Sequence, residues 1–321
     1  MSSYRQLSEW GRENIPFIFF IDYSGQQIQA FPLSDIPRDF ALRFGARSFG
    51  EMRVESFVKP EVTLKKPVAF STYLSVHQTV QEEMLKGNTY LLNLTFPTEI
   101  ELKGSLVDVF EYGTAPYRAI WRDHFCCFSP ESFVTIKDNR ISTTPVKGTS
   151  AVDQDLDGQA LLNNPKERAE HEMVVDLLRN DLAQVATDVE VKRFRFLQQI
   201  KTDRGALWQT ESLIEGDMLP EWPSQTGEIL KTLLPAGSVT GMPKHETCQI
   251  IERVEPVPRD YYCGIFGYYQ DHALYTAVSI RFIAQKGEAF YYHSGGGLTI
   301  DSEAKAEYEE MLLKVYLSGG V

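Results

Sequence analysis

The chain has 321 residues and a formal net charge of -12, with 43% hydrophobic and 24% charged residues. This length and composition predict a globular protein with a substantial core, either one large domain or two intimate subdomains. Nucleic-acid binding needs a basic face, so the acidic balance predicts no nucleic-acid partner. An anionic substrate can still bind through a few placed cations, a metal ion or backbone amides.

The four cysteines show no Cys-x-x-Cys spacing, so the sequence predicts no disulfide framework. Residues 1–10 are polar and lack an apolar signal region, and no apolar run is long enough to span a bilayer. We therefore expect a cytoplasmic protein with no membrane partner.

The first third of the chain alternates strand and helix patterns. Apolar residues at 16–22 and 28–33 predict two strands around a turn, whereas the mixed segment 38–66 predicts irregular structure. A helix is expected over 72–86, ended by Gly87, and a buried strand over 89–95.

The rest of the chain predicts more strands with helices set between them. Asn164 is expected to cap a helix that runs to about residue 181, Pro243 to open another, and Ser302 to cap the last. This order predicts an α+β fold with large antiparallel sheets. The expected strands are 125–128, 133–137, 141–144, 264–269, 274–279, 281–284 and 289–293.

One lysine stands in an unusual local setting. Lys147 lies between Pro145 and Gly148, in a predicted turn that points one side chain away from the backbone. A lysine there supplies an amine to a site, or it is a solvated surface residue.

Two pairs of glutamates have helical spacing. Glu167 and Glu170 share one helix face, and Glu307 and Glu310 share another. A hard divalent cation such as Mg²⁺ prefers oxygen ligands of this kind. The alternative is two solvated faces, with Glu310 pairing Lys314 at i,i+4.

Two glycine-containing segments are candidate anion sites. The amides of Gly295, Gly296 and Gly297 can hold a carboxylate or phosphate, although the triplet also suits a flexible loop. Segment 237–244, with Thr240 and Lys244, opens a helix but departs from the phosphate-loop pattern. It is an anion site or simply a well-capped helix start.

Five ordered segments resemble the chorismate-utilising enzymes. They are 170–182, 236–244, 262–268, 280–281 and 295–310. The resemblance covers about residues 72–317 and implies an α+β sandwich of large antiparallel sheets flanked by helices. It further implies a chorismate-binding catalytic domain at 69–321, preceded by a shortened N-terminal strand region at 1–68 that packs on the core.

Two positions separate branches of this family. Lys147 resembles the aminodeoxychorismate synthases (component I), whereas anthranilate synthases usually carry alanine there. Leu91 stands where isochorismate and salicylate synthases place a lysine that activates water. The resemblance therefore implies formation of 4-amino-4-deoxychorismate from chorismate and ammonia. Anthranilate synthase component I and a chorismate-binding paralogue without turnover are the alternatives.

The resemblance also implies roles for single residues. Lys147 would attack C2 of chorismate, and Glu131 would protonate the leaving hydroxyl. Mg²⁺ would bind the ring carboxylate of the substrate. Its implied ligands are Glu167, Glu170, Glu307 and Glu310. The implied substrate contacts are Arg281, Tyr262, Gly295, Gly296, Gly297, Thr240, Lys244 and Gln209.

Three further expectations follow from the resemblance. Gln209 stands where the family usually has a histidine, and a glutamine cannot transfer protons near neutral pH. Met242 replaces a typically small residue beside Thr240. No cysteine has the glycine-flanked setting of a nucleophile elbow, so a separate glutamine amidotransferase subunit is implied as the source of ammonia.

Overall fold

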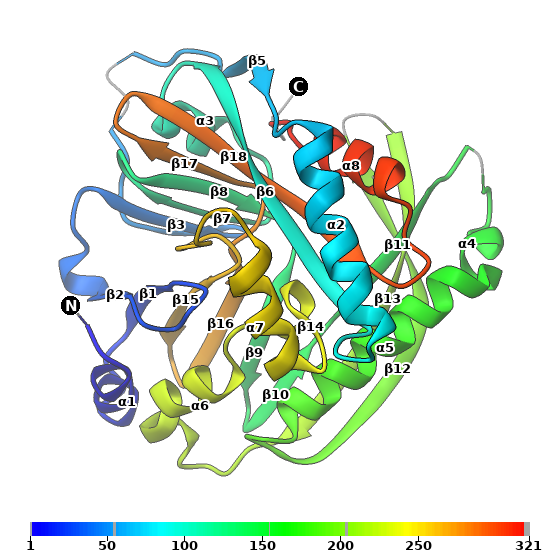
Figure 1. Cartoon of the computed structure of the whole chain (residues 1–321). Helices are drawn as coiled ribbons and strands as arrows, with labels where there is room; N and C mark the ends of the chain where they lie inside the picture. Colours follow the sequence, from blue (N-terminus) through cyan, green and yellow to red (C-terminus); the bar gives the residue numbers. More distant parts are fainter. Residues whose placement is uncertain (1, 54–55, 154, 203–204, 318–321) are drawn as a thin grey trace.

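The computed structural model describes residues 2–53, 56–153, 155–202 and 205–317. Two large antiparallel sheets form the body of the protein, and helices cover them (Figure 1). One sheet, sheet A, contains β1 (Phe17–Ile21), β2 (Ile28–Pro32), β9 (Ser132–Lys137), β10 (Arg140–Thr143), β11 (Val146–Ala151), β12 (Thr187–Thr202), β13 (Gly205–Asp217), β15 (Ile265–Gln270) and β16 (Ala273–Val278). Its order is β11-β13-β10-β9-β16-β15-β1-β2, with β12 also paired to β13.

The second sheet, sheet B, contains β3 (Phe40–Phe44), β4 (Arg47–Phe49), β5 (Glu61–Lys66), β6 (Leu91–Lys103), β7 (Tyr117–Trp121), β8 (Phe125–Ser129), β14 (Gly241–Met242), β17 (Phe282–Lys286) and β18 (Ala289–Leu298). Its order is β14-β6-β18-β17-β8-β7-β3-β4, with β5 also paired to β6. The predicted α+β fold with large antiparallel sheets is confirmed.

The helices are α1 (Tyr4–Arg12), α2 (Phe70–Leu85), α3 (Leu106–Tyr112), α4 (Gln159–Asn163), α5 (Pro165–Leu182), α6 (Thr226–Leu233), α7 (Lys244–Val254) and α8 (Ala304–Leu313). Short 3₁₀ turns are η1 (Leu33–Asp35), η2 (Trp222–Gln225) and η3 (Gly237–Val239). No helix in the described ranges is long and apolar enough to cross a membrane.

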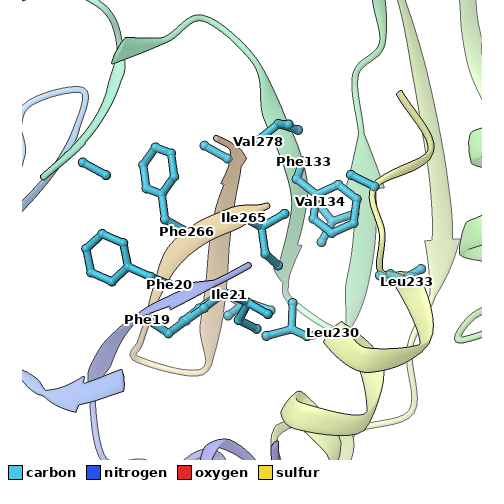
Figure 2. Packing of buried hydrophobic residues seen from close by; sticks show 14 of the residues in the cluster. Phe19, Phe20, Ile21, Phe133, Val134, Leu230, Leu233, Ile265, Phe266 and Val278 are labelled. Carbon is cyan, nitrogen blue, oxygen red and sulfur yellow. The ribbon is translucent and has the colours of Figure 1, made fainter. Parts of the chain in front are cut away.

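The core begins with the predicted N-terminal strand pair. All five residues of β1 are buried, and the strand pairs with β2 on one side and with β15 on the other. Figure 2 shows its side chains packed with those of β15 and with Leu230 and Leu233 of α6. Strands from before residue 68 belong to both sheets, and a domain boundary at that residue stays a prediction.

The sequence predicted irregular structure over 38–66. This prediction is wrong, because the segment contributes three strands of sheet B. Strand β3 pairs with β7, β4 pairs with β3, and β5 pairs with the far end of β6. Strand β5 is almost entirely exposed, so its sequence lacks the apolar alternation of a half-buried strand. Its pairing depends on partners distant in sequence.

The helix caps were predicted with mixed success. The Asn164 side chain accepts from the backbone N–H groups of Lys166 and Glu167, which confirms the predicted start of α5. The start of α8 was predicted one residue too early, because Glu303 is the N-cap residue. The Ser302 hydroxyl instead accepts from the Thr299 N–H and donates to the Glu307 carboxylate.

A buried ion pair joins three elements of the fold. The Arg259 guanidinium contacts both carboxylate oxygens of Glu255, at 2.7 and 2.8 Å, and donates to the carbonyls of Val239 and Asn93. Glu255 also accepts from the backbone and hydroxyl of Thr95. The end of α7, η3 and β6 therefore share one polar network.

We predict that Arg259→Met lowers the free energy of unfolding by about 3–5 kcal/mol, because it leaves Glu255 buried without its cation. Denaturant unfolding measures this change. Arg140→Met is the control, since Arg140 pairs with Glu215 and Asp217 at the surface. Its loss should stay within about 1 kcal/mol. Equal losses in the two variants would contradict a structural role for the buried pair.

Candidate active site

Lys147 lies on a strand rather than in the predicted turn. Residue 147 pairs with Thr210 of β13, whose hydroxyl donates to the Lys147 carbonyl. The pairing register shifts between Lys147 and Thr149, and Gly148 has φ +71° in this bulge. A bulge of this kind re-aims the side chain beside it. The Lys147 ammonium nitrogen lies 3.9 Å from the point that a Cβ on Gly297 would occupy.

The glycine triplet belongs to a strand, not to the predicted loop. Gly295, Gly296 and Gly297 lie in β18 and pair with Thr95, Leu94 and Asn93 of β6. A Cβ on Gly295 would stand 2.2 Å from the Leu94 carbonyl oxygen, so only glycine fits there. Strand β17 pairs with β18 only as far as His293, which leaves one edge of the triplet without a strand partner among the described residues.

Leu91 and Lys147 meet at the same glycine. The Leu91 Cδ1 lies 3.3 Å from the Gly297 Cβ position, and Leu91 is buried. The two positions that separate branches of the family are therefore neighbours in space, although 56 residues separate them in the sequence. One presents an amine and the other an apolar surface.

Glu131 supplies a carboxyl group near the amine. Burial raises the pKa of Glu131, although the Ser238 hydroxyl and the Lys147 charge both act to lower it. The side chain is therefore protonated at higher pH than an ordinary glutamate, as a proton donor requires. Its backbone carbonyl accepts from Val278, which fixes the segment before β9 against β16.

The predicted carboxylates approach one another from two helices. Glu167 Oε2 lies 2.7 Å from the Cβ position of Gly148, and Glu307 Oε2 lies 3.6 Å from that of Gly296. Burial raises the pKa of Glu170, the Lys147 charge opposes it, and the charges of Glu167 and Glu307 add to it. Glu167, Glu170 and Glu307 therefore lie close enough for their charges to interact.

Glu310 takes part in the surface pair that the sequence left as an alternative. It contacts Lys314 at 2.8 Å, and the Lys314 ammonium also donates to the Gly295 carbonyl at 2.9 Å. Lys314 thus stands beside the glycine triplet, although the sequence indicated it only as a helix pair. Within the described residues, no three His, Cys, Asp or Glu side chains already form a metal-binding group.

Arg281 contacts the C-cap of α8, and Tyr262 contacts β18. The Arg281 guanidinium donates to the Lys314 carbonyl at 3.3 Å and lies over the Tyr316 ring. Tyr262 is buried, and its ring lies 5.0 Å from that of His293 in β18. Burial holds the pKa of Tyr262 well above its ordinary value, so its hydroxyl stays protonated.

Two predicted substrate contacts, Lys244 and Thr240, have hydrogen-bond partners within the fold, and their contact with substrate stays a prediction. The Lys244 ammonium contacts both oxygens of Asp181 at 3.1 Å and the Leu233 carbonyl at 2.8 Å. Asp181 lies roughly 16 Å along α5 from Glu170 at 1.5 Å per residue, so Lys244 is far from the carboxylates. The Thr240 hydroxyl is buried and donates to the carbonyls of Ala236 and Gly237.

Gln209 does not face Lys147 either. Successive side chains of a strand point to opposite faces, and Thr210 is the residue paired with Lys147. The Gln209 amide donates to Glu211, which lies on the same face as Gln209. The predicted contact between Gln209 and substrate stays a prediction.

A hydrogen-bond chain that the sequence did not indicate runs from a buried histidine of α5 to the start of β11. His171 follows Glu170 and is fully buried, with Nε2 2.6 Å from the Ser212 hydroxyl. Ser212 in turn donates its N–H to the Pro145 carbonyl. The only sequence signal was a polar residue at a helix position that packs inward.

Comparison with known proteins agrees with this geometry. The family model for chorismate binding enzymes matches residues 48–317, and the chain belongs to this family. An uncharacterized PabA-like protein of Haemophilus influenzae is 46% identical over 313 residues, which are 97% of this chain and 95% of that protein. Aminodeoxychorismate synthase component 1 of Salmonella typhimurium is 33% identical over 249 residues. The match covers 74% of this chain and 54% of the Salmonella enzyme, about half its length.

Solved structures share the fold at low identity. The menaquinone-specific isochorismate synthase MenF of Escherichia coli superposes with a TM-score of 0.77 at 16% identity, over 98% of this chain and 81% of that chain. The fold prediction from the five sequence segments is thus confirmed.

We predict that Lys244→Met destabilises the protein by about 3 kcal/mol, since Asp181 loses its buried cation. The same variant should keep its affinity for chorismate within about twofold, because Lys244 serves the fold. Thermal unfolding and calorimetric titration with chorismate measure the two effects. A stable variant with much weaker chorismate binding would contradict this expectation and would support a contact between Lys244 and the substrate.

Proposed function

We propose that this chain converts chorismate and ammonia to 4-amino-4-deoxychorismate and water, the reaction of an aminodeoxychorismate synthase component 1. The observation that carries the proposal is the meeting of Lys147 and Leu91 at Gly297. The amine is a nucleophile, and the leucine beside it cannot act as a base for water.

The reaction takes two displacements. The Lys147 nitrogen forms a bond to C2 of the ring, the double bond shifts, and the C4 hydroxyl leaves as water with the proton of Glu131. Ammonia then bonds to C4, the double bond shifts back, and the bond from C2 to Lys147 breaks. Lys147 is regenerated, and a proton from the incoming ammonia restores Glu131. The net change replaces one hydroxyl by one amino group.

Magnesium is the cofactor that we propose for this site. Glu167, Glu170, Glu307 and Glu310 would hold it, since all are hard oxygen donors. Gly148 and Gly296 fit this role because a side chain on either would enter the space beside Glu167 or Glu307. When bound, the ion neutralises the ring carboxylate of chorismate and polarises the conjugated ring.

Three protein groups would orient the second carboxylate and the ring. Lys314 offers positive charge beside Gly295, and Arg281, which donates to the Lys314 carbonyl, offers a guanidinium suited to bidentate carboxylate binding. The protonated Tyr262 hydroxyl adds a neutral donor.

A separate glutamine amidotransferase subunit would supply the ammonia, as the component 1 designation of the Salmonella relative indicates. The cytoplasmic location stays a prediction.

Incubation with chorismate, Mg²⁺ and ammonium at mildly basic pH, followed by chromatography, tests the reaction. Lys147→Ala should slow aminodeoxychorismate formation by roughly 10³-fold or more, the scale of losing a nucleophile. Lys137→Ala is the control, because Lys137 is exposed at the end of β9. Anthranilate plus pyruvate from the wild type would indicate an anthranilate synthase, and unchanged chorismate a binding paralogue. Full activity of Lys147→Ala would exclude the covalent route.

The raised pKa of Glu131 predicts the basic limb of the pH profile. The acid form donates the proton, so the rate should fall as pH rises through this pKa. Glu131→Gln should lose about 10²–10⁴-fold in kcat and lose this limb. Rate measurements across pH for both proteins check the assignment. An unchanged limb in Glu131→Gln would assign the titration to another group.

A further inference from the structure

Ser302 has a different partner from the one that its place before α8 predicts. Its hydroxyl donates to Oε1 of Glu307 at 2.8 Å. The other oxygen of that carboxylate, Oε2, lies 3.6 Å from the Cβ position of Gly296. One oxygen is therefore held by the serine, while the second faces the glycine strand.

The serine is itself held in place. Its hydroxyl accepts from the Thr299 N–H, and its own N–H donates to the Thr299 carbonyl, both at 3.1 Å. The Gln81 side chain of α2 donates to the same carbonyl at 2.9 Å. Helix α2 packs beside α8, so it supports the turn that precedes the carboxylates (Figure 1). The hydrogen bonds from Gln81 through Thr299 and Ser302 to Glu307 thus involve no positively charged group.

The neighbouring carboxylate is held in another way. Glu310 contacts the Lys314 ammonium, which offsets part of its negative charge. A hydroxyl orients a carboxylate without cancelling its charge. Of the two proposed metal ligands on α8, Glu307 is thus the one fixed in direction by a neutral group, with its second oxygen beside Gly296.

We propose that Ser302 is a positioning residue for Glu307, which it holds with one oxygen directed into the space beside Gly296 for a divalent cation. This inference rests on the proposed magnesium site. It assigns Ser302 a function in binding that a helix cap would not have.

Calorimetric titration of the full chain with Mg²⁺, without chorismate, tests the inference. Ser302→Ala should weaken Mg²⁺ binding by about 10-fold or more, the usual effect of losing a hydrogen bond that orients a ligand. Ser302→Thr keeps the hydroxyl and should bind within about threefold of the wild type. Thermal unfolding without metal shows whether each variant is folded.

A double-mutant cycle separates positioning from general damage. Glu307→Gln removes the carboxylate that Ser302 holds, so adding Ser302→Ala to it should weaken Mg²⁺ binding no further. An additional loss in the double variant, or wild-type affinity in Ser302→Ala, would overturn the inference. Absence of Mg²⁺ binding by the wild type would overturn it together with the metal site, whereas chromatography of the product reports on the amination itself.

Discussion

The close pairing of β18 with β6 is the constraint on which the site depends. At Gly295 the two backbones approach so closely that no side chain fits between them. This contact makes the glycine strand a fixed floor for the groups around it. Lys147 and Leu91 approach it at Gly297, and Glu307 and Lys314 approach it at Gly296. These residues come from β11, β6 and α8 with its C-cap, so any widening of the strand pair would displace them relative to one another.

The charged side chains around the glycine strand are consistent with a site for an anionic substrate in an acidic protein. A dicarboxylate substrate cannot approach four glutamates unless cations offset them, and Lys147, Lys314 and a divalent ion would do so. Glu131 lies in the same region but is kept closer to neutral by burial. In the proposed reaction the carboxylates would divide by environment into metal ligands and a proton donor, as pairs of acids with separated pKa values do elsewhere.

Local chemistry could be predicted from the sequence, and long-range pairing could not. Asn164 and Pro165 indicate the start of α5, because capping involves only neighbouring backbone groups. Lys147 was identified as an amine of interest, but its strand and bulge depend on β13, some 60 residues later. The ion pair of Lys244 with Asp181 could not be predicted for the same reason, since the two residues are close only in the folded chain. The glycine triplet has a composition typical of a loop, and only β6 makes it a strand.

In the proposed reaction, the choice of nucleophile would depend on the contact between the two sheets rather than on either segment alone. Strand β11 belongs to sheet A and β6 to sheet B, and both reach Gly297. In the proposed reaction, the Lys147 amine with the apolar Leu91 opposite it would favour attack by nitrogen, and Leu91 could not act as a base for water. Exchanging the chemistry would require changes on both strands, because a base at position 91 would still face the Lys147 amine. A chain with only one of these residues would not specify the reaction.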